Sequence, residues 1–270
     1  MSVTAASRPR RIRRAVLGTL CVAAVLTLPA CGPLGQDSKD PKTTGKTTGK
    51  GGEEKKAAPF ADLSGPEIAE KASKATRGAS SLTLKADLQD TEEGHIVFDM
   101  ALSTKGDCTG TMSMNDEGNV IITKVGKTVY MQYDEEFLRA QAKGEPKAET
   151  DAVVKMLAGR WVKTDATSPD AKDFVTFCDL DELLSAYEGG SVARKGPLGT
   201  VNNQPTIALT ETDGKDSYTM HVATEGEPYL LKVVSTGTDP GTMIFSDFNK
   251  PVPAKVPADK DILDLDNLNG

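Results

Sequence analysis

Apolar and polar residues alternate along much of the chain that follows residue 80. Apolar or small residues occupy every second position in 82–88, 96–102 and 108–114, and two further strand-like segments follow at 120–125 and 128–133. The connections between these segments are short and rich in Gly, Asp and Asn, as in β-turns. A period of two with short turns predicts an antiparallel meander of five strands that has one apolar face.

Helical patterns precede and follow this meander. Ser64 and Glu67 have the spacing of a capping box, and Pro66 suits the first turn, so a helix is expected over 64–79. Three more short helices are predicted from helix-forming residues with apolar positions about one turn apart, at 134–142, 149–161 and 179–187. The acids at the start of the last helix, Asp179, Asp181 and Glu182, lack the spacing of a calcium loop and are best explained by helix capping.

Strand patterns return in the last third of the chain. They are predicted at 206–210, 217–223, 229–235 and 242–248, with a weaker strand at 191–195. The order of elements predicts an α+β fold in which one large antiparallel β-sheet packs against a helical layer. A sheet of nine or ten twisted strands tends to curl. Curling around helices encloses a space, which side chains either fill or leave as a cavity.

The start of the chain has the layout of a secretion signal. Five arginines lie within 8–14, an apolar segment of fourteen residues follows at 15–28, and small residues come next. These features predict a signal peptide over 1–30. The apolar segment is shorter than the roughly 20 residues that span a bilayer, so cleavage is expected rather than a permanent transmembrane helix. The export route, general or twin-arginine, stays open.

The residues at the end of this segment, Leu28-Pro29-Ala30-Cys31, resemble the lipobox of bacterial lipoproteins. The resemblance implies that a diacylglyceryl group is attached to Cys31, which becomes the first residue of the mature chain. Two acyl chains suffice for stable membrane anchoring. The alternative is an ordinary signal peptide that happens to be followed by a cysteine.

Composition divides the rest of the chain. Residues 31–59 contain almost no apolar side chains and include a Thr-Thr-Gly-Lys duplication, which is typical of a disordered polar tether. A single α+β domain is expected over 60–265, followed by a short C-terminal tail at 266–270. Removal of 1–30 reduces the 32 basic residues to 27 against 39 acidic ones, a net charge of about −12. Such a surface disfavours nucleic acid as a partner.

Two cysteines remain within the expected domain. Cys108 and Cys178 are predicted to form a disulfide, because an extracytoplasmic compartment is oxidising. Two separate buried thiols are the alternative.

Residues that carry catalytic chemistry are scarce. The two histidines, His95 and His221, lie on strand faces opposite the apolar positions, and no metal-ligand spacing, phosphate-binding loop or nucleophile elbow occurs. We therefore expect a protein that is not an enzyme and that needs no metal or cofactor.

Methionine is unusually frequent on the apolar face. Methionine side chains adapt to varied apolar partners, so a methionine-rich face suits a variable apolar ligand. An ordinary core shows the same inward alternation and is the competing explanation. The candidate lining residues of the space inside the sheet are Leu84, Ile96, Phe98, Met100, Leu102, Met112, Met114, Val129, Met131, Leu209, Met220 and Leu231.

Several segments together resemble a known family. They are GDCTGTMSM at 106–114, KTVYMQ at 127–132, AGRWVK at 158–163, FCDLDELL at 177–184 and FSDFNKPVPAKVP at 245–257. With the lipobox and tether, they resemble the LppX/LprG-like bacterial lipoproteins, whose fold is similar to LolA. The resemblance implies a half-barrel of antiparallel sheet, covered by helices, with a cavity for acyl chains.

These observations predict a lipoprotein on the outer face of the cell membrane, anchored through Cys31, that binds or carries an apolar ligand of the lipid class. The alternative is a non-catalytic sensor or protein-interaction module of the cell envelope, built on the same scaffold with a filled core. The identity of the ligand and the oligomeric state stay open.

Overall fold

The computed structural model describes residues 59–92, 94–185 and 192–264. The predicted signal peptide, Cys31 and all but the last residue of the predicted tether lie outside the described residues. So do the end of the helix predicted at 179–187, the first residue of the strand predicted at 191–195, and 265–270.

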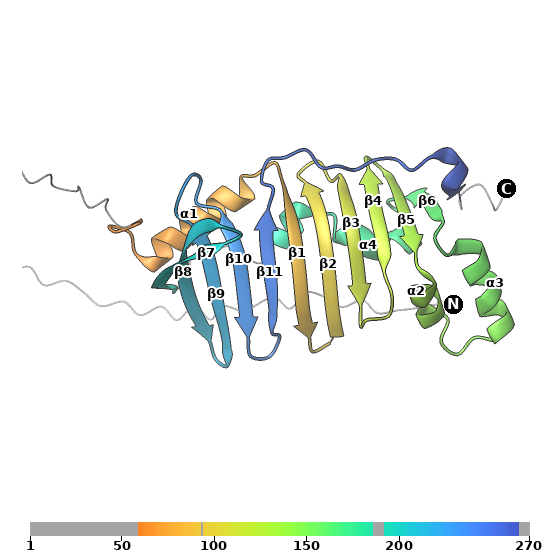
Figure 1. Cartoon of the computed structure of the whole chain (residues 1–270), viewed down its shortest axis with the longest axis horizontal. Helices are drawn as coiled ribbons and strands as arrows, with labels where there is room; N and C mark the ends of the chain where they lie inside the picture. The colour runs from red at the N-terminus through yellow and green to blue at the C-terminus, as the bar shows by residue number, and fades with distance from the viewer. Residues whose placement is uncertain (1–58, 93, 186–191, 265–270) are drawn as a thin grey trace, which may run out of the picture. The chain divides into compact units, whose positions relative to one another are not determined.

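The described residues form one twelve-stranded sheet with five α-helices (Figure 1). The helices are α1 (Gly65–Arg77), α2 (Glu135–Gln141), α3 (Lys147–Leu157), α4 (Pro169–Thr176) and α5 (Leu180–Ser185), and a 3-10 turn, η1, spans Asp259–Asp261. The strands are β1 (Ser81–Asp90), β2 (Gly94–Ser103), β3 (Cys108–Met114), β4 (Val120–Val125), β5 (Thr128–Tyr133), β6 (Trp161–Asp165), β7 (Arg194–Val201), β8 (Gln204–Asp213), β9 (Asp216–Ala223), β10 (Leu230–Thr236), β11 (Gly241–Ser246) and β12 (Ile262–Asp264).

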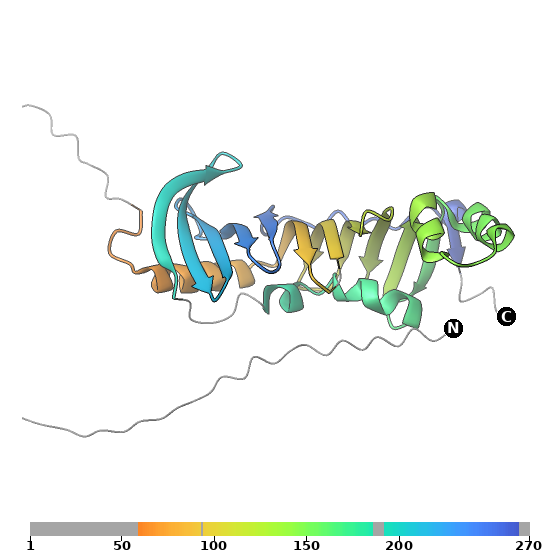
Figure 2. The ribbon, with the colours of Figure 1, turned by 90° about the horizontal axis from the view of Figure 1, so that it is seen from below.

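The strand order places the first strand in the middle of the sheet. The order is β12-β6-β5-β4-β3-β2-β1-β11-β10-β9-β8-β7, so the N-terminal meander and the C-terminal strands meet at β1 and β11. All neighbours are antiparallel except β12 and β6, which are parallel. Within the described residues β7 and β12 form the edges, and the sheet is open. Figure 2 shows that it bends most strongly at the β7 end. The predicted α+β class with a large curled sheet is confirmed.

Register aligns apolar side chains in a row across the sheet. Leu84 of β1 lies opposite both Phe245 of β11 and Met100 of β2. On the other side of Gly110 the row continues through Ile122 and Met131. Because side chains alternate between faces with a period of two, this register puts all of them on the same face.

Gly110 of β3 interrupts the row for a steric reason. A Cβ atom at this position would lie 2.6 Å from the Sδ atom of Met100 and 2.1 Å from the backbone oxygen of Asp99. Glycine therefore lets the Met100 side chain lie across β3. Any larger residue would push the methionine out of the row.

Helices cover the apolar face. Figure 2 shows α1 and the α4–α5 segment on the same side of the sheet. Helix α1 starts at a complete capping box, in which Glu67 accepts a hydrogen bond from the backbone N of Ser64 at 2.7 Å. Its buried residues Ile68 and Ala72 pack against Ile207 and Leu209 of β8. Segment α4–α5 packs on β1–β5 through apolar side chains.

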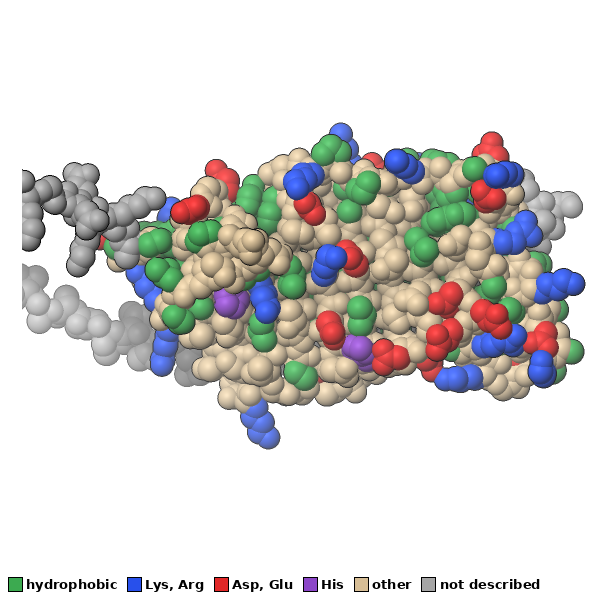
Figure 3. Space-filling model, in the orientation of Figure 1, with side chains coloured by type: hydrophobic (Ala, Val, Ile, Leu, Met, Phe, Trp, Pro, Cys, Tyr) green, Lys and Arg blue, Asp and Glu red, His purple; other side chains and the backbone are tan. Residues whose placement is uncertain are grey.

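The other face of the sheet, seen in Figure 3, carries charged and polar side chains interspersed with hydrophobic ones. Lys85 and Asp99 form a cross-strand ion pair at 2.6 Å between β1 and β2. The hydroxyls of Thr109 and Thr123 form a hydrogen bond at 2.8 Å between β3 and β4. Thr123 and Tyr130 on this face are nevertheless buried, and the chain after β11 runs beside Thr83 and Ala101.

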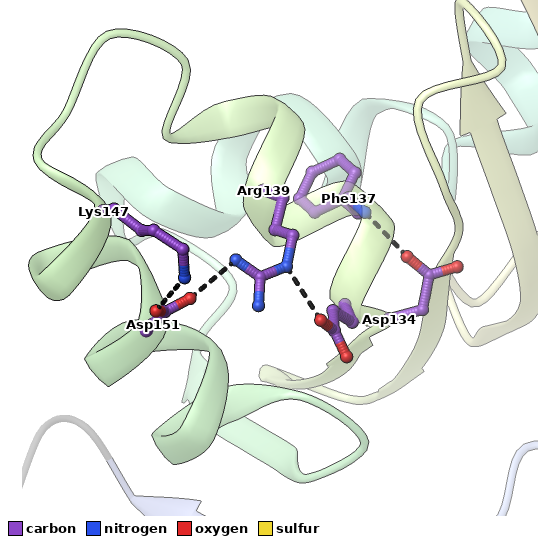
Figure 4. Close-up of polar contacts among 6 residues, drawn as sticks. Asp134, Phe137, Arg139, Lys147 and Asp151 are labelled. Carbon is purple, nitrogen blue, oxygen red and sulfur yellow. Dashed lines mark hydrogen bonds and ion pairs between the residues drawn. The ribbon is translucent and has the colours of Figure 1, made fainter.

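Helices α2 and α3 form a hairpin (Figure 4) that lies beside β5 and β6 in Figure 1. Asp134 caps α2 by accepting a hydrogen bond from the backbone N of Phe137 at 2.8 Å. Arg139 of α2 joins the two helices through an ion pair with Asp151 of α3 at 2.9 Å, and it also pairs with Glu135 of its own helix at 2.8 Å. Phe137 of α2 also packs against the apolar cluster on the helix-covered face of the sheet.

Some elements are not predicted by the sequence patterns. Trp161, expected at the end of a helix, instead starts β6, because Gly159 adopts a positive φ and ends the helical segment. Helix α4 was missed although Ser168 and Pro169 provide its cap and first residue. Strand β12 has three residues and exists through its parallel pairing with β6, which no local pattern reveals.

The predicted disulfide between Cys108 and Cys178 is present, with Cα atoms 5.4 Å apart. Both residues are buried within the main apolar cluster. Cys108 lies at the start of β3, and Cys178 lies between α4 and α5. The bond therefore ties the helical cover to the sheet.

Replacing both cysteines by serine should lower the free energy of unfolding by about 4 kcal/mol, because the bridge closes a loop of 70 residues in the unfolded chain. Chemical denaturation of the wild type and the double variant measures the difference. Adding a reductant should lower the stability of the wild type only. Equal stability of the two proteins under oxidising conditions would show that the bridge contributes nothing.

Candidate apolar ligand site

The predicted lining residues fall into three groups. Most belong to the main cluster between β1–β5 and the α4–α5 segment, either buried in it or packed against it, namely Leu84, Ile96, Phe98, Met100, Leu102, Met112, Met114, Val129, Met131 and Met220. Leu209 belongs to the cluster under α1, which Met220 also contacts. Met220 thus links the two clusters.

Leu231 lies elsewhere. It packs with Val201 and Ala223 in a third cluster, bordered by Tyr229 and Phe248. The ladder between β9 and β10 shifts register between Leu230 and Lys232, so Leu231 is the extra residue of a bulge. The sequence period could not reveal this, because a bulge reverses the alternation after it.

The cover over the main cluster is small. It consists of α4, α5 and the turn between them, and its inward side chains include Ala171, Phe174, Leu180 and Leu184. The ring of Phe177, in the turn, lies 6.0 Å from the ring of Phe98 on β2. The cover makes its contacts with apolar side chains of the sheet.

The centre of the lining is closed in this structure. Met100, Leu102, Val129 and Leu209 each have 0% of their surface exposed. A side chain that bordered a water-sized cavity would expose surface to it, so these residues contact other protein atoms on all sides. Ile96, Met114 and Met220 are only partly buried and form the border of the closed region.

A groove of about 580 Å³ lies beside the cover. One wall is the turn between β2 and β3, with Lys124 of β4, and the other is formed by α4, the following turn and the start of α5. Cys178 and Leu180 line the groove and also belong to the main apolar cluster. The sequence offered no signal for this groove because α4 was not expected.

His95 lies on the polar face, between two carboxylates. Its Nε2 is 3.0 Å from Oδ1 of Asp87, and its Nδ1 is 3.1 Å from Oδ1 of Asp116. These two carboxylates, Asp87 foremost, raise the pKa of His95 above its usual value of 6.5. Through these two contacts the ring joins β1, β2 and the turn after β3.

The pKa of His221 on β9 is shifted in the opposite direction. Burial and, secondarily, the charge of Lys232 lower the pKa of His221. Its Nδ1 is buried and has no hydrogen-bond partner among the described residues. The two histidines lie on different strands and share no site.

Asp179 acts as a helix cap, as expected. Its Oδ1 accepts a hydrogen bond from the backbone N of Glu182 at 3.1 Å. In the part of the chain that the structure describes, no group of three or more His, Cys, Asp or Glu side chains is arranged to hold a metal ion. No helix among the described residues is long and apolar enough to cross a membrane.

Comparison with solved structures finds similar folds. The lipoprotein LppX of Mycobacterium tuberculosis is 15% identical, with a TM-score of 0.45 over 70% of this chain and 96% of LppX. LprF from Mycobacterium bovis is 14% identical, with a TM-score of 0.49 over 72% of this chain and 97% of LprF. A LolA-superfamily protein from Nitrosomonas europaea is 7% identical, with a TM-score of 0.26 over 72% and 96% of the two chains.

These matches are to the group of proteins that the sequence resembles, and at identities of 15% or less and TM-scores below 0.5 they bear on the fold alone. No protein-family model matches the sequence. No curated protein matches it either.

The environment of His95 predicts a pH dependence of stability. Because folding raises its pKa, the contribution is fully present below about pH 6.5, the ordinary value, and is lost as pH rises through the raised pKa. His95→Gln should remove this part of the pH dependence. NMR titration of the ring measures the pKa, which Asp87→Asn should lower. A ring pKa at or below 6.5 in the wild type would contradict the arrangement.

Proposed function

We propose that this protein is a membrane-anchored, extracytoplasmic lipoprotein that binds or carries an apolar ligand of the lipid class between the sheet and the α4–α5 cover. The observation that supports this most is the apolar row across the sheet, which Gly110 interrupts at β3. It includes Leu84, Met100, Ile122 and Met131, and it is covered by two short helices rather than by a second sheet or a long helix.

Ligand binding requires a change in the cover, because the centre of the lining is closed. An acyl chain would replace the side chains of α4 and α5 as the partner of the sheet. It would gain about 0.8 kcal/mol for each CH₂ group removed from water, against the cost of exposing the displaced apolar side chains. Methionines can repack around such a chain because their side chains are unbranched and flexible. The disulfide would keep the displaced cover attached near Cys178.

Anchoring belongs to the same proposal. Cleavage after residue 30 would leave Cys31 as the acylated first residue, with 31–59 connecting it to the domain. A membrane-attached domain would meet lipids directly. The net negative charge of the mature chain means that the acyl groups, rather than basic side chains, would supply the attachment.

One observation favours a second candidate. The fully buried side chains at the centre of the lining are also what an interaction module with a filled core requires. In that case the cover would never open, and the function would lie on the outer surface. Ligand binding separates the two candidates.

Cys31→Ala should prevent anchoring, because the thiol that would receive the diacylglyceryl group is lost. Cells that express the variant should contain unprocessed precursor or release the protein from the membrane fraction. Cys21→Ala, within the same predicted signal peptide, is the matched control and should leave processing unchanged. Normal processing and anchoring of the Cys31 variant would rule out the lipobox interpretation.

A phospholipid with an environment-sensitive fluorophore on its acyl chain should bind the delipidated protein. Met114→Gln with Met220→Gln should weaken binding about three- to tenfold, since each change places an amide against the acyl chain.

The matched control is Met156→Gln. Met156 is exposed on α3, outside the lining, so the same chemical change should leave the affinity unaltered. Equal affinities of all variants, or no binding by the wild type, would favour the interaction module.

A further inference from the structure

The groove beside the cover is lined mostly by polar and charged residues. Two of its lining residues, Cys178 and Leu180, are each only 2% exposed and belong to the same apolar cluster as Met100. The groove is therefore open to solvent on one side and borders the closed lining on the other. Its volume of about 580 Å³ is within the range of small-molecule sites.

Two lysine side chains in the walls form no ion pair with the residues that the structure describes. Lys105 is in the turn between β2 and β3, and Lys172 is on α4, so they come from the two opposite walls. Both are exposed, and neither forms an ion pair with any residue that the structure describes. Lys124 differs, because its Nζ donates a hydrogen bond to the backbone oxygen of Gly106 and holds that turn.

Two carboxylates in the groove also lack an ion-pair partner among the described residues. Asp181 and Glu182 are exposed in the first turn of α5, and within the described ranges neither side chain forms an ion pair. Asp179 is occupied as the cap of that helix. The groove thus presents two ammonium and two carboxylate groups that are available to a ligand.

We propose that the groove binds the zwitterionic phosphate-and-amine headgroup of a phospholipid. Lys105 and Lys172 receive the phosphate, Asp181 and Glu182 receive the ammonium group, and the acyl chains extend over Leu180 toward the lining. The assignment rests on the proposed function and specifies its ligand. A purely anionic headgroup would meet the carboxylates unfavourably, and a neutral one would leave all four charges unpaired.

Titration of the delipidated full-length protein with three lipids that carry identical acyl chains tests the assignment. The lipids are phosphatidylethanolamine, phosphatidylglycerol and diacylglycerol, and bound lipid is counted by native mass spectrometry. Phosphatidylethanolamine should bind about tenfold more tightly than each of the others, as expected for a few solvent-exposed charge interactions.

Charge-removing variants distinguish the two halves of the site. Lys105→Gln with Lys172→Gln should weaken both phosphate-bearing lipids about three- to tenfold and leave diacylglycerol unchanged. Asp181→Asn with Glu182→Gln should weaken phosphatidylethanolamine by a similar factor and strengthen phosphatidylglycerol. Lys215→Gln and Asp213→Asn, at the exposed turn between β8 and β9, are the matched controls and should change nothing.

The outcomes separate this assignment from the proposed function. Equal affinity for the three lipids, without an effect of the variants, overturns the headgroup assignment and leaves lipid binding intact. Failure of all three lipids to bind overturns both. If free phosphoethanolamine binds as tightly as the lipid, the groove belongs to a soluble zwitterion and the lipid source is wrong.

Discussion

The register between β1 and its two neighbours is the constraint on which the rest of the structure depends. Leu84 faces Met100 on one side and Phe245 on the other, so the two halves of the chain contribute to the same apolar face. A shift by one residue would turn this row to the polar side, where Lys85 pairs with Asp99. Because the row lies on one face, a single helical layer is enough to cover it, and α1 and the α4–α5 segment form that layer.

The layer has two parts with different attachments. Helix α1 packs its Ile68 and Ala72 on β8, and its Thr76 hydroxyl accepts a buried hydrogen bond from the backbone N of Leu230 at 2.9 Å. The α4–α5 cover lies over the methionine-rich region and is joined to β3 through Cys178. Under the proposed function, the α4–α5 cover would exchange its apolar contacts for a ligand, and the disulfide would keep it attached to the domain.

Much of this arrangement is predictable from the sequence. The period of two identifies the five-strand meander, the Ser64–Glu67 pair marks α1, and the cysteine pair with an expected oxidising compartment identifies the disulfide. These features are local or follow from composition. The alternation also places ten of the twelve candidate lining residues in or against one cluster.

What the sequence could not supply depends on contacts between distant segments. The bulge that carries Leu231 and the parallel pairing of β12 with β6 are decided by neighbouring strands. The groove requires the turn after β2 and the start of α5 to face each other, although more than seventy residues separate them. The sequence also cannot predict that the centre of the lining is filled by side chains, because a filled core and a ligand site show the same alternation of apolar residues.

The central claim is that an apolar ligand binds between the sheet and the cover. The most direct measurement is the native mass of the protein gently extracted from the membrane of cells that produce it. The account predicts a population heavier than the acylated polypeptide by the mass of a lipid, which organic extraction removes. A single species with the mass of the acylated polypeptide alone would contradict it.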